Sequence, residues 1–323
     1  MVFCERCDMI LELQKGNIYK CSSCDKIVCK ECFNEEINIC SICTITDLQK
    51  LTKDIEIAYE ELADEYDDRI YGPDSTFTPD LKEQVFVETE MEFLFSKVFG
   101  QDNVLELGCG TGRITIPMAG KVKSVTATDI SSAPLEVAQK KAERASIAHK
   151  ITFRQGDMVS LPFDSSTFSV VVSTLALMHV PRQHRSKVFS EVSRVLAPNG
   201  RLIISVKNKK FEEISTQDLF GRGDTTSVKT NEIIFGGTKS GSTYRLMWNS
   251  FSFQELETLF VKHGFHIVDM RGNMPLIAWL DNRILNSDSS LAKAMVQLER
   301  VLGNISPFNH LGYYYLIEAL KIT

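Results

Sequence analysis

The stretch Val104-Leu105-Glu106-Leu107-Gly108-Cys109-Gly110-Thr111-Gly112-Arg113 decides the fold of this chain. Its apolar half predicts a buried strand, and its alternating glycines predict a tight turn into a helix. A backbone without Cβ atoms can take positive φ and approach a small ligand closely, and the next helix offers unpaired N–H groups. A glycine-rich connection that binds nothing is the alternative. The G-x-G-x-x-G dinucleotide fingerprint is not met, because Arg113 replaces its third glycine.

Downstream of this loop, short β-rich runs alternate with amphipathic segments. The predicted strands are 124–128, 151–154, 168–173 and 201–206, and the predicted helices are about 133–146 and 182–196. This alternation is typical of βαβ units, so the expected fold class is α/β, with a doubly wound, mostly parallel sheet covered by helices on both faces. Ligands in such folds bind beyond the carboxyl ends of the strands.

Two carboxylates stand at predicted strand ends. Asp129 ends the second strand, where it can accept hydrogen bonds from both hydroxyls of a ribose. Asp157 follows the third strand, where it can accept a hydrogen bond from the exocyclic amine of adenine while Met158 packs on the ring. The alternatives are helix or turn caps for Asp129 and Asp157, and a solvated strand-end charge for Glu106.

Four motifs in order resemble those of class I S-adenosylmethionine-dependent methyltransferases of the type 11 and type 25 kind. They are 105–112, 128–130, 156–158 together with 161–163, and 196–202, and the resemblance covers about residues 55–323. It implies a seven-stranded sheet and S-adenosylmethionine as cofactor. It also implies that Gly108 and Gly110 line the methionine part of the cofactor, Glu106 places its amino group, Asp129 holds the ribose and Asp157 the adenine. The full implied cofactor set is Glu106, Gly108, Cys109, Gly110, Gly112, Asp129, Ile130, Asp157 and Met158.

The C-terminal third agrees with that family. A helix is expected over 253–263 and an antiparallel terminal pair of strands over 265–271 and 312–321. Two further segments are insertions: about 221–250, expected to form a hairpin near the mouth of the active site, and about 274–310, expected to add helices.

Methyl transfer requires alignment of the nucleophile, exclusion of water and sometimes removal of a proton, so no obligatory side-chain signature follows. The segment 173–179 lacks the Asp/Asn-Pro-Pro-aromatic tetrad with which related enzymes methylate exocyclic amines of nucleic-acid bases. His179 is the candidate general base, and a packing or helix-terminal histidine is the alternative.

Eight of the nine cysteines form four C-x-x-C pairs before residue 44. Two such pairs can complete a closed tetrahedral Cys4 site, so two zinc ions are favoured over disulfides or an iron–sulfur cluster. The spacing resembles the cross-brace modules of RING and FYVE domains, although it lacks their histidine ligand and basic run. That resemblance pairs Cys4, Cys7, Cys29 and Cys32 at one ion, and Cys21, Cys24, Cys40 and Cys43 at the other.

The predicted organisation has three parts: a zinc-binding module over 1–46, a helical linker and cap over 47–100, and the methyltransferase domain over 101–323. Within the linker, 48–71 is an acidic amphipathic helix, and Thr78-Pro79 begins a second helix that runs to about Phe99. The module carries no excess of basic residues, so we expect it to contact protein rather than nucleic acid.

The chain has a net charge of −6, no apolar run of 18 residues and no signal peptide, so a cytoplasmic protein without a membrane span is expected. The favoured activity is methylation of a small-molecule acceptor. Methylation of RNA or protein delivered by the zinc module is the alternative, and a non-catalytic cofactor-binding protein is a third.

Overall fold

We describe a computed structural model of the 323-residue chain. The residues that the structure describes are 48–63, 81–215, 232–235, 244–247, 249–280 and 290–322, together with six short strands before residue 41. These strands pair as antiparallel ribbons: β1 with β2, β3 with β4, and β5 with β6. Their bounds are Val2–Phe3, Ile10–Leu11, Ile18–Lys20, Ile27–Cys29, Phe33–Asn34 and Ile39–Cys40.

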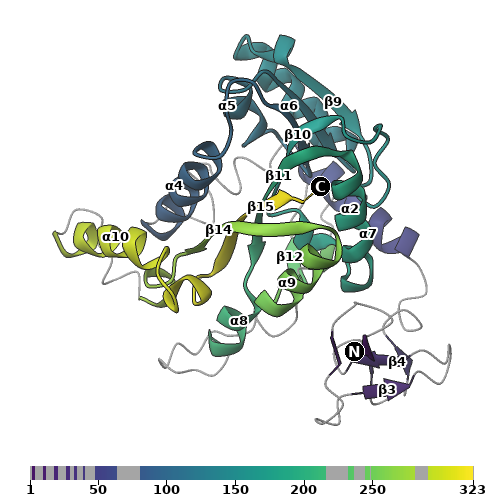
Figure 1. The fold of residues 1–323 in the computed structure, drawn as a ribbon. Coiled ribbons are helices and arrows are strands. Elements are labelled where there is room, and N and C mark those ends of the chain that lie inside the picture. The colour runs from purple at the N-terminus through teal and green to yellow at the C-terminus, as the bar shows by residue number, and fades with distance from the viewer. Residues whose placement is uncertain are drawn as a thin grey trace.

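A seven-stranded sheet forms the centre of the molecule, in the order β14-β15-β11-β10-β7-β8-β9 (Figure 1). Its strands are β7 (Asn103–Leu107), β8 (Ser124–Asp129), β9 (Ile151–Gln155), β10 (Phe168–Thr174), β11 (Leu196–Lys207), β14 (Phe265–Asn273) and β15 (Tyr314–Lys321). The pairs from β9 to β11 are parallel, and β15 runs antiparallel to both of its neighbours. The predicted fold class and the antiparallel terminal pair are therefore confirmed.

Alternating side chains of the central strands fill two separate cores, one on each face of the sheet. Val171 packs in the core that includes residues of α7 (Arg182–Val195) and α9 (Phe253–Lys262). Val170 and Val172 pack in the other, with residues of α4 (Leu81–Phe95), α5 (Thr115–Ala119) and α6 (Ser132–Arg144). Because strand side chains alternate in direction, an unbroken apolar run is what a strand covered on both faces needs. The sheet is thus doubly wound.

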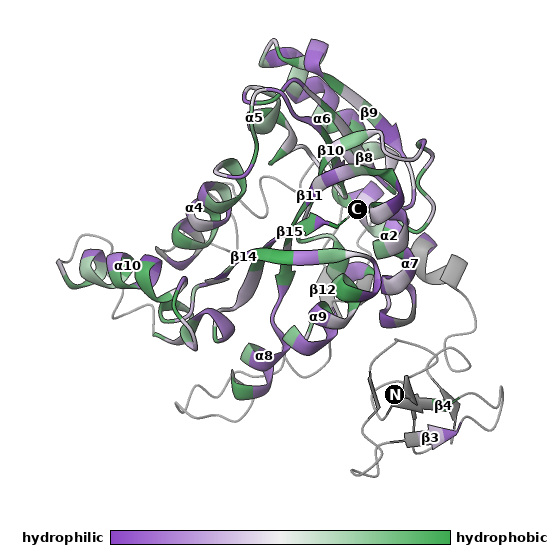
Figure 2. Cartoon of the chain, viewed as in Figure 1, coloured by the Kyte–Doolittle hydropathy of each residue, from purple (hydrophilic) through white to green (hydrophobic). Residues whose placement is uncertain are grey.

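The covering helices carry both apolar and polar residues, as Figure 2 shows for α4, α6 and α10. In the predicted linker, α2 spans Leu48–Leu62, which confirms the first part of the expected 48–71 helix. Its remainder and the Thr78-Pro79 cap lie outside the described residues. Within those residues, no helix is long and apolar enough to cross a membrane.

Both predicted insertions contain the expected elements. Strands β12 (Glu232–Phe235) and β13 (Tyr244–Met247) pair as an antiparallel hairpin. Between β14 and β15 lie the helix α10 (Ser290–Leu302) and two single 3₁₀ turns, η4 (Ile277–Trp279) and η5 (Phe308–His310). A short helix, α8 (Lys209–Ser215), follows β11, and η2 (Ala148–Lys150) precedes β9.

The eight predicted zinc ligands lie where the structure does not describe the side chains. Cys29 and Cys40 end strands β4 and β6, five of the other six cysteines fall between the short strands, and Cys43 follows β6 in the sequence. Among the described residues, no group of three or more His, Cys, Asp or Glu side chains could hold a metal ion. The two-zinc module therefore stays a prediction.

Candidate cofactor site

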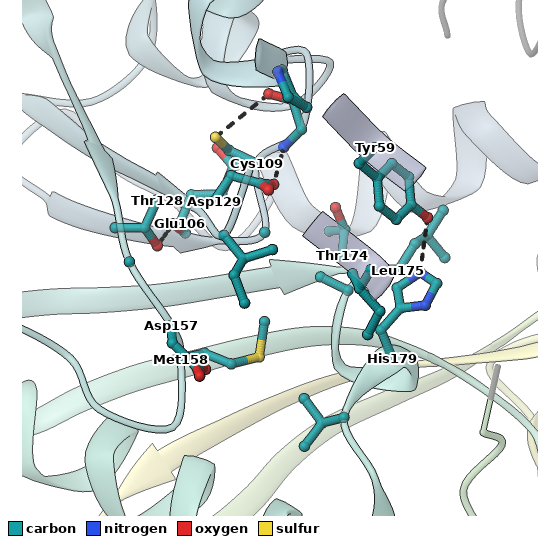
Figure 3. A pocket seen from close by; sticks show the side chains of 18 of the residues that line it. Tyr59, Glu106, Cys109, Thr128, Asp129, Asp157, Met158, Thr174, Leu175 and His179 are labelled. Atoms are coloured by element: carbon teal, nitrogen blue, oxygen red, sulfur yellow. Dashed lines mark hydrogen bonds between the residues drawn. The ribbon is translucent and has the colours of Figure 1, made fainter. Parts of the chain in front are cut away.

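One cavity collects His179 and most of the predicted cofactor residues. It lies at the carboxyl ends of β7, β8, β9 and β10, and its empty volume is about 1290 Å³, including solvent at its mouth. Figure 3 shows the side chains around it. Eight of the nine predicted cofactor residues line the cavity: Glu106, Gly108, Cys109, Gly110, Asp129, Ile130, Asp157 and Met158.

The three glycines of the loop all have positive φ, of 71°, 51° and 85° in chain order, but different surroundings. A Cβ on Gly108 would lie 2.3 Å from the Cβ of Ala176, so this position is closed to any larger residue. A Cβ on Gly112 would lie 3.1 Å from the Cβ of Ala138 on α6, and Gly112 does not line the cavity. A Cβ on Gly110 would meet no protein atom within 4 Å, because it would project into open space. Gly110 is thus the glycine whose bare backbone faces a ligand site.

Asp129 ends β8 and fixes the glycine loop. Its Oδ2 accepts a hydrogen bond from the Gly110 N–H at 2.8 Å, and its Oδ1 accepts one from the Ser131 N–H at 3.0 Å. Burial raises the pKa of the Asp129 carboxyl, and these two N–H groups oppose that rise. The carboxylate therefore acts as a turn cap, as the alternative interpretation expected, and also lines the cavity.

Glu106 is the most deeply buried carboxylate of the cavity wall, with 2% of its surface exposed. Its Oε2 accepts a hydrogen bond from the Thr115 hydroxyl of α5 at 2.7 Å. Burial raises the pKa of Glu106 to about 7, while Thr115 and the charge of Arg113 oppose the rise. A solvated strand-end charge, the alternative expected for Glu106, is wrong. Such a buried carboxylate favours a cationic ligand group.

The loop after β9 supplies the far end of the cavity, at Asp157 and Met158. The Asp157 Oδ1 accepts a hydrogen bond from the Val159 N–H at 3.0 Å, so this carboxylate also caps a turn. The loop is tied to β8, because the Gly156 N–H donates to the Asp129 carbonyl at 2.9 Å. Figure 3 shows Asp157 and Met158 well apart from Tyr59 and His179.

Helix α2 forms a wall of the site that was not predicted from the sequence. Its Ile55 and Tyr59 line the cavity together with Ala63, which follows the helix, and Ala58 and Leu62 are buried. The apolar periodicity of α2 predicted a buried face but not what it covers. The signal that could have identified the wall is Tyr59, a polar-tipped aromatic residue on an otherwise aliphatic face.

His179 lies in the 3₁₀ turn η3 (Leu177–His179) that follows β10, and it lines the cavity. Its Nε2 is 3.0 Å from the hydroxyl oxygen of Tyr59, and the two rings meet edge to face with centroids 5.6 Å apart. The turn is preceded by Leu175, whose φ of 56° is unusual for a branched side chain. The Leu175 N–H donates to the Ser205 carbonyl at 3.1 Å, which holds this bend against β11.

The fold and the cavity together define an α/β protein with a small-molecule site at the carboxyl edge of its sheet. A family profile described as "Methyltransferase domain" matches residues 104–200. A demethylmenaquinone methyltransferase of Lactiplantibacillus plantarum is 34% identical over 179 residues, which are 51% of this chain and 71% of that protein. The chain therefore belongs to the class I S-adenosylmethionine-dependent methyltransferase family.

Solved structures share the fold at low sequence identity. The structure titled "DhpI-SAM-HEP complex" has a TM-score of 0.55 at 19% identity, over 85% of this chain and 99% of that one. A geranyl diphosphate C-methyltransferase from Streptomyces coelicolor A3(2) has a TM-score of 0.53 at 16% identity, over 85% of this chain and all (100%) of that one. These likenesses concern the fold alone.

Proposed function

We propose that this protein transfers a methyl group from S-adenosylmethionine to a small-molecule acceptor. The observation that carries the proposal is the convergence of Glu106, Gly110 and Asp129 on one cavity. Each supplies what one part of the cofactor needs: a buried carboxylate, an open stretch of backbone and a strand-end carboxylate.

The residues present fit that cofactor. Glu106 would pair with the amino group of the methionine part, because a buried carboxylate with a raised pKa gains most from a nearby cation. The space in front of Gly110 would take the chain of the methionine part. Asp129 would accept hydrogen bonds from the ribose hydroxyls, and Asp157 and Met158 would hold the adenine ring.

The cofactor supplies an activated methyl group when it is bound. The contribution of the chain is to align the acceptor, exclude water and move a proton where the acceptor requires it. Helix α2 contributes Ile55 and Tyr59 to the cavity wall and so shields part of the site from solvent. His179 lies on the cavity wall and is the candidate proton acceptor.

The acceptor that we propose is a mainly apolar small molecule. Around Tyr59 and His179, the cavity is lined by the aliphatic side chains of Ile55, Leu175 and Val180. The demethylmenaquinone methyltransferase that is 34% identical to this chain is named for a small-molecule acceptor, demethylmenaquinone. RNA or protein delivered by the N-terminal module is the second candidate.

The experiment that separates these acceptors uses radiolabelled S-adenosylmethionine and fractionated cell extract. Label that enters an organic-extractable fraction and resists nuclease and protease supports the small-molecule proposal. Label that is released by nuclease or by protease would favour RNA or protein, respectively, as the methyl acceptor. Purified protein with Asp129→Ala is the control, and its label incorporation should fall.

We further propose that the cysteine pairs of residues 1–46 hold two zinc ions and form a docking module. Closed Cys4 sites supply folding energy and no open coordination position, and a module this small needs its metal to fold. The eight cysteines support the two zinc sites. The absence of an excess of basic residues supports contact with protein, either this chain's own domain or a partner.

A further inference from the structure

We infer that Tyr59 and His179 form a proton relay, and that the acceptor is a molecule with an ionisable hydroxyl of the acidity of a phenol. The inference rests on the proposed function and adds to it the acceptor class and a second residue, Tyr59. The observation is the 3.0 Å contact between the Tyr59 hydroxyl and His179 Nε2 on the wall of the cavity.

The two side chains come from elements far apart in sequence. Tyr59 projects from α2, and His179 from η3, so the contact links the helix over the cavity to the end of β10. Both elements are fixed independently of this contact. The Ser131 hydroxyl donates to the Glu56 carbonyl of α2 at 3.1 Å, and the Asn249 N–H donates to the Met178 carbonyl of η3 at 2.8 Å. Strand β13 packs against both α2 and η3. These contacts therefore hold the Tyr59 and His179 side chains in position relative to each other.

The other ionisable groups of the cavity belong to the cofactor end. They are Glu106, Cys109, Arg113, Asp129 and Asp157. Burial raises the pKa of the Cys109 thiol well above its usual value, which keeps it protonated. Glu106, Asp129 and Asp157 are assigned to the cofactor. An acceptor beside Ile55, Leu175 and Val180 thus meets the Tyr59–His179 pair as its ionisable contact.

The contact gives an order of proton movement for one tautomer of His179. In the Nδ1–H tautomer of His179, the Tyr59 hydroxyl donates to Nε2, and its oxygen can accept a hydrogen bond from the hydroxyl of the acceptor. The acceptor's O–H bond breaks as its proton passes to the Tyr59 oxygen, while the original Tyr59 proton passes to Nε2. His179 becomes an imidazolium, and the acceptor becomes an anion. The anion, at its oxygen or a conjugated carbon, forms a bond to the methyl carbon as the carbon–sulfur bond breaks and its electron pair stays on sulfur. The imidazolium then returns its proton to water.

The test is an optical titration of 4-nitrophenol, whose ionised form is coloured, in the presence of saturating S-adenosylhomocysteine. The variants are Tyr59→Phe, His179→Gln and the double variant. Tyr313→Phe is the matched control, because it removes a tyrosine hydroxyl that does not line the cavity. Binding of S-adenosylhomocysteine is measured by calorimetry on the same samples.

The relay predicts that the wild-type protein and Tyr313→Phe lower the apparent pKa of bound 4-nitrophenol by ~1 unit, the effect of a nearby opposite charge. Either single substitution should abolish the shift, and the double variant should lose no more than either single one, because the two groups act as a unit. Wild-type protein that binds S-adenosylhomocysteine without shifting the phenol, or Tyr59→Phe that retains the shift, overturns the relay and leaves the proposed function standing. Failure of wild-type protein to bind S-adenosylhomocysteine overturns the proposed function itself.

Discussion

Glu60 of α2 caps the amino terminus of α6 at Ser132. One carboxylate oxygen, Oε1, accepts hydrogen bonds from the Ser132 N–H at 2.5 Å and the Ser132 hydroxyl at 2.9 Å, and also from the Ala133 N–H at 3.2 Å. Ser131, at the usual capping position, makes no side-chain cap. A carboxylate there satisfies unpaired N–H groups and complements the helix dipole. Since α6 begins just after Asp129, this contact joins α2 to the proposed ribose site.

Glu60→Ala should therefore destabilise both the fold and the bound state. We expect a loss of about 1 kcal/mol in the free energy of unfolding, typical of a lost helix cap, and weaker binding of S-adenosylmethionine. Thermal unfolding and calorimetry measure the two effects. Glu136→Ala, at an exposed position on α6, is the control and should change neither. Equal behaviour of the two variants would show that the Glu60 cap contributes nothing.

Cofactor affinity should depend on pH through Glu106. Burial raises the pKa of this carboxyl to about 7. A bound ammonium group favours the ionised form, so binding below pH 7 requires loss of a proton, and affinity should fall by up to ~10-fold per pH unit. Glu106→Gln should bind weakly and without this dependence. Glu299→Gln is the control, because Glu299 is also buried with a pKa of about 7 but lies outside the cavity lining.

The raised pKa of Glu106 also affects the unliganded protein, whose stability it favours at low pH, whereas cofactor binding is favoured at high pH. A carboxyl whose folded pKa exceeds its unfolded value of 4.5 contributes stability that is full below pH 4.5 and lost as pH rises through about 7. Between these limits, wild-type protein should lose more stability with rising pH than Glu106→Gln does. Denaturant unfolding at pH 5 and pH 8 checks the difference, and parallel curves would contradict the raised pKa.

Two glycine substitutions should separate folding from binding. Gly108→Ala places a Cβ 2.3 Å from Ala176, so it should lower stability strongly. Gly110→Ala meets no protein atom and costs only the strain of a positive φ, ~1 kcal/mol. It should fold but bind S-adenosylmethionine poorly, since its methyl group occupies ligand space. Unchanged affinity in Gly110→Ala would show that the glycine loop does not contact the cofactor.

Zinc content tests the proposed module directly. Elemental analysis of the full chain should give near two equivalents of zinc, the number that eight thiolates bind as two Cys4 sites. A chain starting at Leu48 should give none and should retain cofactor affinity. One equivalent of zinc, or a yellow-brown iron chromophore, would overturn the two-site interpretation. Loss of salt-sensitive RNA binding on truncation would favour the RNA-directed alternative.

The sheet was predictable because its signals are local. Val170, Val171 and Val172 lie within one apolar run that both faces of the sheet require, and the residues at the strand ends follow from the topology. The role of Gly112 was not predictable from the motif, because its closeness to Ala138 depends on how the glycine loop packs on α6. The Tyr59–His179 contact joins residues 120 positions apart, so no local pattern encodes it.

The most direct test of the account is the calorimetric affinity for S-adenosylmethionine and its demethylated product in wild-type protein, Asp129→Ala and Asp157→Ala. We predict that both ligands bind the wild type and that Asp129→Ala loses ~1–3 kcal/mol of binding free energy, the cost of removing a charged partner from buried hydroxyls. Circular dichroism of the same samples establishes that the variants are folded. Undiminished affinity in both Asp129→Ala and Asp157→Ala would contradict the assignment of this cavity to the cofactor.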